Sequence, residues 1–268
     1  SSPVVGHLTD DNGDGVLDAG DIPDIVIVTD DGETGPPTQG VMRSISGDGS
    51  SVHWSFMHVD TEDGQVLVHR YAGLALGDID DDGQPEIVTL VELIAAPDGG
   101  SGGDHEDPVD EDHPVGPPPP PTEHDEGGEE EPMGINMGYP AAFDAAGNLE
   151  WLATDAPFDC GGHTPAIADL DGDGDVEIVM GSVIIEGSDG SVVSIGDEGM
   201  GIYEIFEEMG AISIIVDLDG DGTQEIIAGR TLYGPDGGVL CSLADSEIDG
   251  YTAAADLNGD GLGEFIVV

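Results

Sequence analysis

The stretch ADLDGDGDVEIV, residues 168–179, alternates acidic and small residues and then runs into an apolar segment. A closely similar stretch, VDLDGDGTQEII, occupies residues 216–227. In both, acids stand at every second position through a glycine-containing turn, with apolar residues on either side. Turn-forming residues between two short apolar runs predict a strand, a loop and a second strand. The pattern therefore predicts an all-β building block.

The same pattern occurs five times. The other copies are ALGDIDDDGQPEIVTL (75–90), AAADLNGDGLGEFIVV (253–268) and the longer HLTDDNGDGVLDAGDIPDIVIV (7–28). Repetition at this scale indicates an array of supersecondary units, each of which needs its neighbours to bury its faces. We therefore expect a repeat architecture.

Each of the first four copies has a hairpin pattern in its unit, at 43–56, 141–153, 183–195 and 231–243. Asp-Gly and Gly-Asn steps between β-prone runs are hairpin signals. A unit is thus predicted to have four antiparallel strands, which is the blade of a β-propeller. We expect a β-propeller with four full blades and a half blade, at about 1–58, 72–155, 162–197, 210–245 and 251–268. Trp54 and Trp151 hold equivalent places in these hairpins, which predicts packing between blades.

The acidic loops have the composition of calcium sites. Calcium prefers six to eight oxygen ligands from a flexible loop, whereas zinc prefers nitrogen and sulfur. Side-chain oxygens at positions one, three and five, the carbonyl at position seven and an acid at position nine would provide such a shell. About five Ca2+ sites are predicted, with these ligands: Asp10, Asn12, Asp14, Val16 and Asp18; Asp78, Asp80, Asp82, Gln84 and Glu86; Asp169, Asp171, Asp173, Asp175 and Glu177; Asp217, Asp219, Asp221, Thr223 and Glu225; Asp256, Asn258, Asp260, Leu262 and Glu264.

The first loop is longer than the others. Asp21 falls at position twelve counted from Asp10, a spacing closer to that of an EF-hand loop, although that family has Glu there. Asp24 stands directly before the apolar run. The sequence leaves open whether Asp18, Asp21 or Asp24 completes this loop.

The motifs DLDGDGDVEIV (169–179) and DLDGDGTQEII (217–227) resemble the FG-GAP or VCBS repeats of integrin-α-like propellers. The resemblance covers most of the chain outside residues 97–135. It implies a propeller with calcium in the loop between the first two strands of each blade. It also implies an extracellular protein of adhesion, recognition or surface architecture.

Charge excludes several functions. The 268 residues include 59 Asp and Glu and only 3 Lys and Arg, all of them arginine, for a net charge of −56. Such a chain would be repelled by nucleic acid and by anionic membranes, and no apolar run is long enough for a transmembrane helix. We expect each arginine to pair with an acid.

Cys160 and Cys241 could form a disulfide or remain thiols.

Residues 97–132 form an acidic, proline-rich insert with 13 acids and 9 prolines. This composition cannot build a core and predicts a solvated loop. It would serve either as a spacer or as a loop that collects calcium or docks a partner.

No GxSxG, HExxH or Cys/His catalytic arrangement occurs, and we expect the chain not to be an enzyme. The predicted function is a secreted or cell-surface calcium-binding repeat protein for adhesion or filament architecture, with a protein or glycan partner. The fifth unit has only two strands, so self-association through its open edge is a further possibility. The alternative is a carbohydrate-binding or carbohydrate-cleaving propeller.

Overall fold

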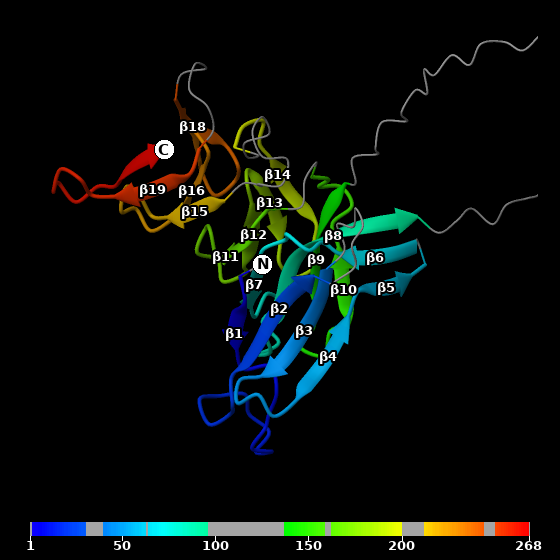
Figure 1. The fold of residues 1–268 in the computed structure, drawn as a ribbon. Helices are drawn as coiled ribbons and strands as arrows, with labels where there is room; N and C mark the ends of the chain where they lie inside the picture. Colours follow the sequence, from blue (N-terminus) through cyan, green and yellow to red (C-terminus); the bar gives the residue numbers. More distant parts are fainter. Residues whose placement is uncertain are drawn as a thin grey trace, which may run out of the picture.

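The computed structural model describes residues 2–30, 40–62, 64–95, 137–158, 162–199, 212–243 and 250–267. Within these ranges the protein is all-β, with antiparallel sheets and no helix (Figure 1). We number the units by their acidic loops. Unit 1 contains β1 (Val4–Gly6), β2 (Asp24–Asp30), β3 (Gly40–Ser46) and β4 (Val52–Phe56). Unit 3 contains β11 (Ala166–Ala168), β12 (Glu177–Met180), β13 (Val183–Glu186) and β14 (Val192–Ile195). Unit 4 contains β15 (Ser213–Val216), β16 (Glu225–Ala228), β17 (Thr231–Tyr233) and β18 (Val239–Ser242). Unit 5 contains β19 (Thr252–Ala255) and β20 (Glu264–Val267).

Unit 2 is larger than the sequence pattern predicts. It contains β7 (Leu74–Gly77), β8 (Glu86–Ala95), β9 (Gly138–Phe143) and β10 (Leu149–Leu152), and a further hairpin of β5 (His58–Thr61) and β6 (Gly64–Val68). The first half of β8 pairs with β7, and its second half pairs with β6. The result is a sheet in the order β10-β9-β8-β6-β5, with β7 beside β8.

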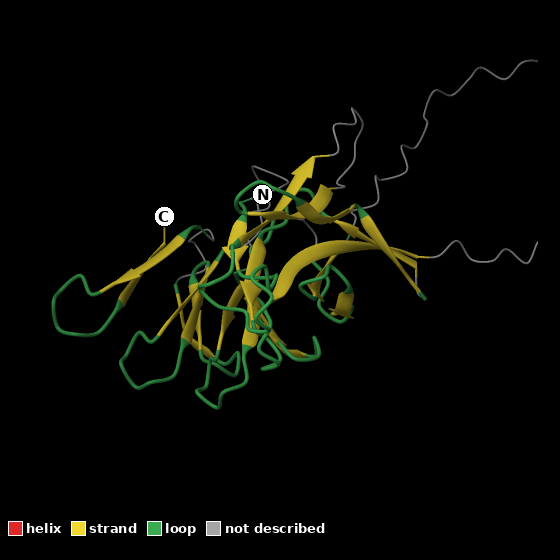
Figure 2. Ribbon diagram, turned by 90° about the horizontal axis from the view of Figure 1, so that it is seen from below, coloured by secondary structure: helices red, strands yellow, loops and turns green. Residues whose placement is uncertain are grey.

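The first strands of the units stand next to one another in chain order, with contacts of β1 to β7, β7 to β11, β11 to β15 and β15 to β19 (Figure 1). Just ahead of β11 and β15, Thr164 and Ile212 form a parallel bridge. Every acidic loop follows a first strand, so neighbouring first strands place neighbouring loops at the same end of their sheets. Long connecting loops lie along the lower rim in Figure 2.

The hydrophobic core lies between successive sheets. Strand β8 shows this best, because Ile87 and Val91 belong to the cluster shared with unit 1, whereas Val88 and Leu90 belong to the cluster shared with unit 3. A third cluster joins units 3 and 4 through residues such as Leu170 and Tyr233. Burial on both faces explains why the second strands of units 2, 3 and 4, which are β8, β12 and β16, are continuous apolar runs rather than alternating ones.

Two tryptophans join adjacent units, as expected from their equivalent places. The indole Nε1 of Trp54 donates a hydrogen bond to the Ala145 carbonyl in unit 2 at 2.9 Å. That of Trp151 donates to the Gly187 carbonyl in unit 3 at 2.8 Å. Each tryptophan therefore fixes a fourth strand to the next unit.

Candidate metal centres in the acidic loops

The five acidic loops share one hydrogen-bonding scheme in which carboxylates organise the backbone. The first Asp accepts from the N–H of the position-six glycine in every loop, at 2.8–3.1 Å in Asp10–Gly15, Asp78–Gly83, Asp169–Gly174, Asp217–Gly222 and Asp256–Gly261. The side chains at positions three and five each accept from the N–H two residues further on. Directly after each position-six glycine comes the position-seven residue, which is Val16, Gln84, Asp175, Thr223 or Leu262 in the five loops. The loops are thus folded by their own acids.

The turn requires left-handed backbone at positions four and six. Glycine has this conformation at both positions in four loops, with φ from 74° to 103° at Gly13, Gly15, Gly172, Gly174, Gly220, Gly222, Gly259 and Gly261. Loop 2 has Asp81 at position four with φ of 60°, the one non-glycine with positive φ among the described residues. An L-residue is strained there, although Asp tolerates it better than most.

The terminal acid connects each loop to its second strand. Glu86, Glu177, Glu225 and Glu264 are the first residues of β8, β12, β16 and β20. Their Oε2 atoms accept from the N–H groups of the position-two residues at 2.7–2.9 Å, with these donors: Ile79, Leu170, Leu218 and Leu257.

Carboxylate oxygens converge in three of the loops. The groups Asp78, Asp80 and Asp82; Asp169, Asp171 and Asp173; and Asp217, Asp219 and Glu225 each bring three ligand atoms within 4.8 Å of one another. In loops 1 and 5 position three is an asparagine, Asn12 or Asn258, whose oxygen accepts from position five in the same way. Several acidic clusters can therefore hold a metal ion.

Loop 1 separates the three acids that the sequence left open. Asp24 pairs in register with Gly6, as Glu86 pairs with Gly77, and it accepts from the N–H of Leu8 at 3.1 Å. It therefore takes the structural place of the terminal Glu. The acidic turn begins three residues later than in the other units, and Asp21 faces it.

Asp21 accepts from the N–H groups of Asn12 at 3.3 Å and Asp18 at 3.0 Å, and the bond from Asp18 lowers its pKa. Asp18 instead accepts from the Gly20 N–H within its own turn. Asp24 is fully buried and contacts His53 Nε2 at 2.7 Å. The geometry favours Asp21 as the acid that closes this loop.

Units 2 and 3 concentrate carboxylates that resist ionisation. Burial, with further repulsion from Asp80, Glu150 and Asp82, raises the pKa of Glu86 to about 7. Burial also raises the pKa of Glu177, and that of Glu186, which lies directly opposite it across β12 and β13. Two like charges opposite each other on neighbouring strands repel. A cation at these loops would relieve that repulsion.

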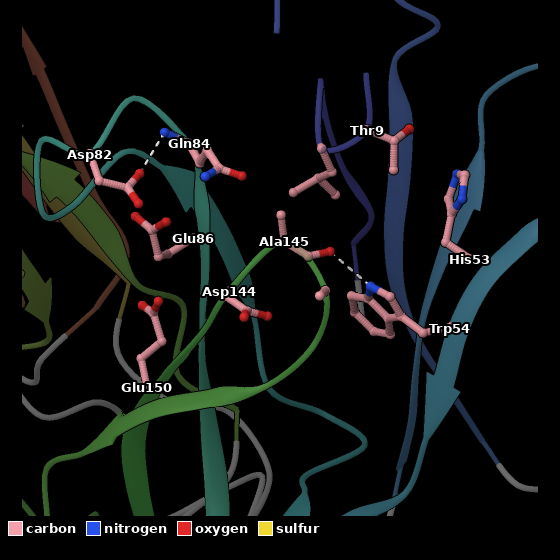
Figure 3. Close-up of a pocket in the computed structure, with 11 residues that line it drawn as sticks. Thr9, His53, Trp54, Asp82, Gln84, Glu86, Asp144, Ala145 and Glu150 are labelled. Carbon is pink, nitrogen blue, oxygen red and sulfur yellow. Dashed lines mark hydrogen bonds between the residues drawn. The ribbon is translucent and has the colours of Figure 1, made fainter. Parts of the chain in front are cut away.

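A cavity of about 530 Å3 lies between units 1 and 2 (Figure 3). One side carries Asp82, Glu86, Asp144 and Glu150, and the other carries His53 and Trp54. Asp144 and Glu150 belong to β9–β10 rather than to an acidic loop. Sequence reasoning did not find this cavity, because its walls come from separate units.

Other sequence predictions concern positions that the structure describes only in part. Cys241 is exposed, whereas Cys160 lies outside the described residues. The acidic insert, residues 97–132, also lies outside them. The disulfide and the insert's role stay predictions. In the described part of the chain no helix is long and apolar enough to cross a membrane.

Comparison with known proteins gives structural matches alone. No family model matches the chain, and no curated protein matches it. The biofilm matrix protein Bap1 of V. cholerae matches all of this chain with 24% identity and a TM-score of 0.62, and the match covers 34% of Bap1. The rhamnogalacturonan lyase PL11 of Bacillus licheniformis has 14% identity over the whole chain and a TM-score of 0.46, with 55% of the lyase covered. The exotype rhamnogalacturonan lyase YesX has 15% identity and a TM-score of 0.41, covering 95% of this chain and 50% of the lyase.

These comparisons establish a likeness of fold with Bap1, and the chain spans about a third of that protein's length. They correct one expectation. The prediction that the chain is not an enzyme rested on missing motifs. It is contradicted, because rhamnogalacturonan lyases, which are enzymes, are among the similar structures. Missing short motifs exclude only chemistries that use those motifs. The lyase matches, with TM-scores below 0.5, assign no activity to this chain.

Proposed function

We propose that this chain is an arc of a calcium-binding β-propeller of the FG-GAP or VCBS type, with a role in extracellular matrix or surface architecture. The observation that carries the proposal is the shared loop geometry, in which carboxylates converge within 4.8 Å in three units. The contacts between successive first strands, and cores placed between successive sheets, support the radial arrangement of a propeller.

Calcium is the cation that this donor set suits best. The loops offer oxygen donors alone, from short side chains in a turn that can adjust to a large ion. Magnesium demands a stricter octahedron, and zinc prefers imidazole and thiolate ligands. In this proposal calcium ties each first strand to its second strand and offsets the repulsion among the acids.

The likeness of fold to a biofilm matrix protein supports the extracellular and architectural part of the proposal. A chain with net charge −56 stays soluble and resists unspecific contact with other polyanions. Self-association along β20, which pairs only with β19 in the described part of the chain, stays a prediction that light scattering tests.

The test is thermal unfolding with calcium, with magnesium and with EDTA. At an ion concentration ten times the dissociation constant, each site adds about 1.4 kcal/mol to the free energy of unfolding, and five sites add about 7 kcal/mol. We expect EDTA to lower the melting temperature steeply and calcium, but not equimolar magnesium, to restore it. An unchanged melting temperature in EDTA would refute the proposal.

A second candidate function is carbohydrate binding at the cavity of Figure 3. It combines an aromatic side chain, Trp54, with Asp144 and Glu150, carboxylates outside the acidic loops. Carboxylates accept hydrogen bonds from sugar hydroxyls, and an aromatic ring gives an apolar contact surface. A glycan array with the wild type and with Glu150→Gln tests it. Glycan binding that Glu150→Gln leaves unchanged would place the site elsewhere.

A further inference from the structure

The three arginines differ in their partners. Arg70 forms an ion pair with Asp30 at 3.5 Å, and Arg230 forms one with Glu198 at 2.7 Å. Arg43 forms no ion pair within the described residues, although 59 acids stand against three arginines in the chain. Among the described residues, Arg70 and Arg230 meet the expectation that each arginine pairs with an acid, and Arg43 has no such pair.

Arg43 lies in the middle of β3, opposite Ile27 of β2 and Ser55 of β4. Its side chain is half-buried, and Nη1 donates a hydrogen bond to Thr29 Oγ1. A guanidinium carries five N–H donors in a planar fork that fits a carboxylate in two parallel bonds. Thr29 accepts from one of them, which leaves donors for a further acceptor.

Arg43 lines a groove of about 470 Å3 at β3, β4 and the start of β5, with Val41, Ser55, Phe56, Met57 and His58. None of these described lining residues is an acid. Three other cavities in the described part of the chain all include carboxylates in their walls. The groove at Arg43 therefore differs from those three cavities, because its described lining carries an arginine and a histidine and no carboxylate that would repel an anion.

We propose that this groove binds a small monocarboxylate with an apolar body. The Arg43 fork would hold the carboxylate, with Ser55 as a further donor. Val41, Phe56 and Met57 would contact the apolar part. A single guanidinium matches one negative charge. A phosphate dianion would gain twice the attraction from Arg43 but also meet twice the repulsion from the surrounding acids, and it has no apolar body for Val41, Phe56 and Met57 to contact.

The experiment compares benzoate with benzamide, its neutral counterpart of similar shape, on the calcium-loaded full chain. Binding is followed by the NMR signal of the Met57 methyl group, whose residue is 38% exposed. We expect benzoate to shift this signal at concentrations where benzamide does not. Arg43→Gln should weaken benzoate binding roughly ten-fold, since bonds to charged groups are the strong ones. Arg43→Lys should weaken it too, because lysine lacks the fork.

Arg230→Gln, a change in unit 4 far from β3 in the chain, is the matched control and should leave benzoate binding unchanged. If Arg43→Gln does not fold, the benzoate–benzamide difference on the wild type still decides. Equal binding of the two compounds, no response of Met57, tighter binding of inorganic phosphate than of benzoate, or undiminished binding by folded Arg43→Gln would each overturn the proposal. So would a wild-type dimer that Arg43→Gln abolishes without any benzoate binding, because the groove would then hold a carboxylate of a second copy.

Discussion

Replacing Glu86 with glutamine should have opposite effects on stability with and without calcium. Glu86 begins β8, is 2% exposed, and accepts the Ile79 N–H through Oε2 at 2.9 Å. A glutamine keeps an oxygen acceptor for that bond but removes the charge. The substitution therefore isolates the electrostatic part of the side chain's contribution.

The magnitude follows from the pKa. Burial, then the neighbouring acids, raises the pKa of Glu86 from 4.5 to about 7. A tenfold change in an ionisation equilibrium corresponds to about 1.4 kcal/mol, so keeping Glu86 ionised in the folded, calcium-free protein costs up to roughly 3 kcal/mol. Between these two pH values the folded state binds more protons than the unfolded chain. The free energy of unfolding therefore falls as pH rises through this window and is highest below it, as far as this group is concerned.

The assay is urea unfolding at about pH 8 and about pH 5, in EDTA and in calcium. At the higher pH, the stability difference between Glu86→Gln and the wild type should have opposite signs in EDTA and in calcium. In EDTA at the higher pH, Glu86→Gln should be more stable than the wild type. At the lower pH the difference should shrink. In calcium at the higher pH, Glu86→Gln should be less stable, because the proposed ion loses a charged ligand.

Asp48→Asn is the control. Asp48 lies in the exposed β3–β4 turn, where hydrogen bonds from Ser50 and Ser46 lower its pKa. Its contribution is present above its unfolded pKa, which lies below both pH values of the assay, so Asp48→Asn should destabilise at both, and equally in EDTA and in calcium. A Glu86→Gln variant that is no more stable than the wild type in EDTA at about pH 8 would refute the reasoning.

Two further predictions concern the backbone and the contacts between units. Asp81→Gly should raise the free energy of unfolding by about 0.5–1 kcal/mol, because it removes left-handed strain at φ of 60°. The reverse change at the same loop position in unit 3, Gly172→Asp, should lower it. Urea unfolding in calcium measures both, and a change of the same sign in the two variants would contradict the argument. Trp151→Phe should cost about 1–3 kcal/mol, because it leaves the Gly187 carbonyl without its 2.8 Å donor, and an unchanged urea midpoint would show that this bond contributes nothing.

The strands and loops of units 3 and 4 were predictable because their signal is local. In 168–179 the alternation of acids, the glycines and the apolar run all lie within twelve residues. The positive φ values of Gly172 and Gly174 show the same local cause. Where a turn is determined by its own residues, sequence reasoning is sufficient.

Unit 2 was not predictable to the same degree. The Asp-Gly step at 63–64 is a hairpin signal that lies outside the repeated pattern. The run EIVTLVELIA of β8 is mostly apolar along its whole length, and nothing in it indicates that its two halves pair with β7 and β6. The place of Asp24 depends on its register with Gly6, which is a property of pairing between strands rather than of the loop.

The hydrogen bonds of the loops indicate how calcium would stabilise this fold. In each loop the first Asp accepts backbone N–H groups, so these hydrogen bonds help to order the turn. The unrelieved repulsion lies at the second strands, in Glu86 with its neighbours and in Glu177 opposite Glu186. Calcium would then act mainly on the attachment of each loop to its second strand. Since the second strands hold the cores between units, removal of calcium should loosen the contacts between sheets before it unfolds the loops themselves.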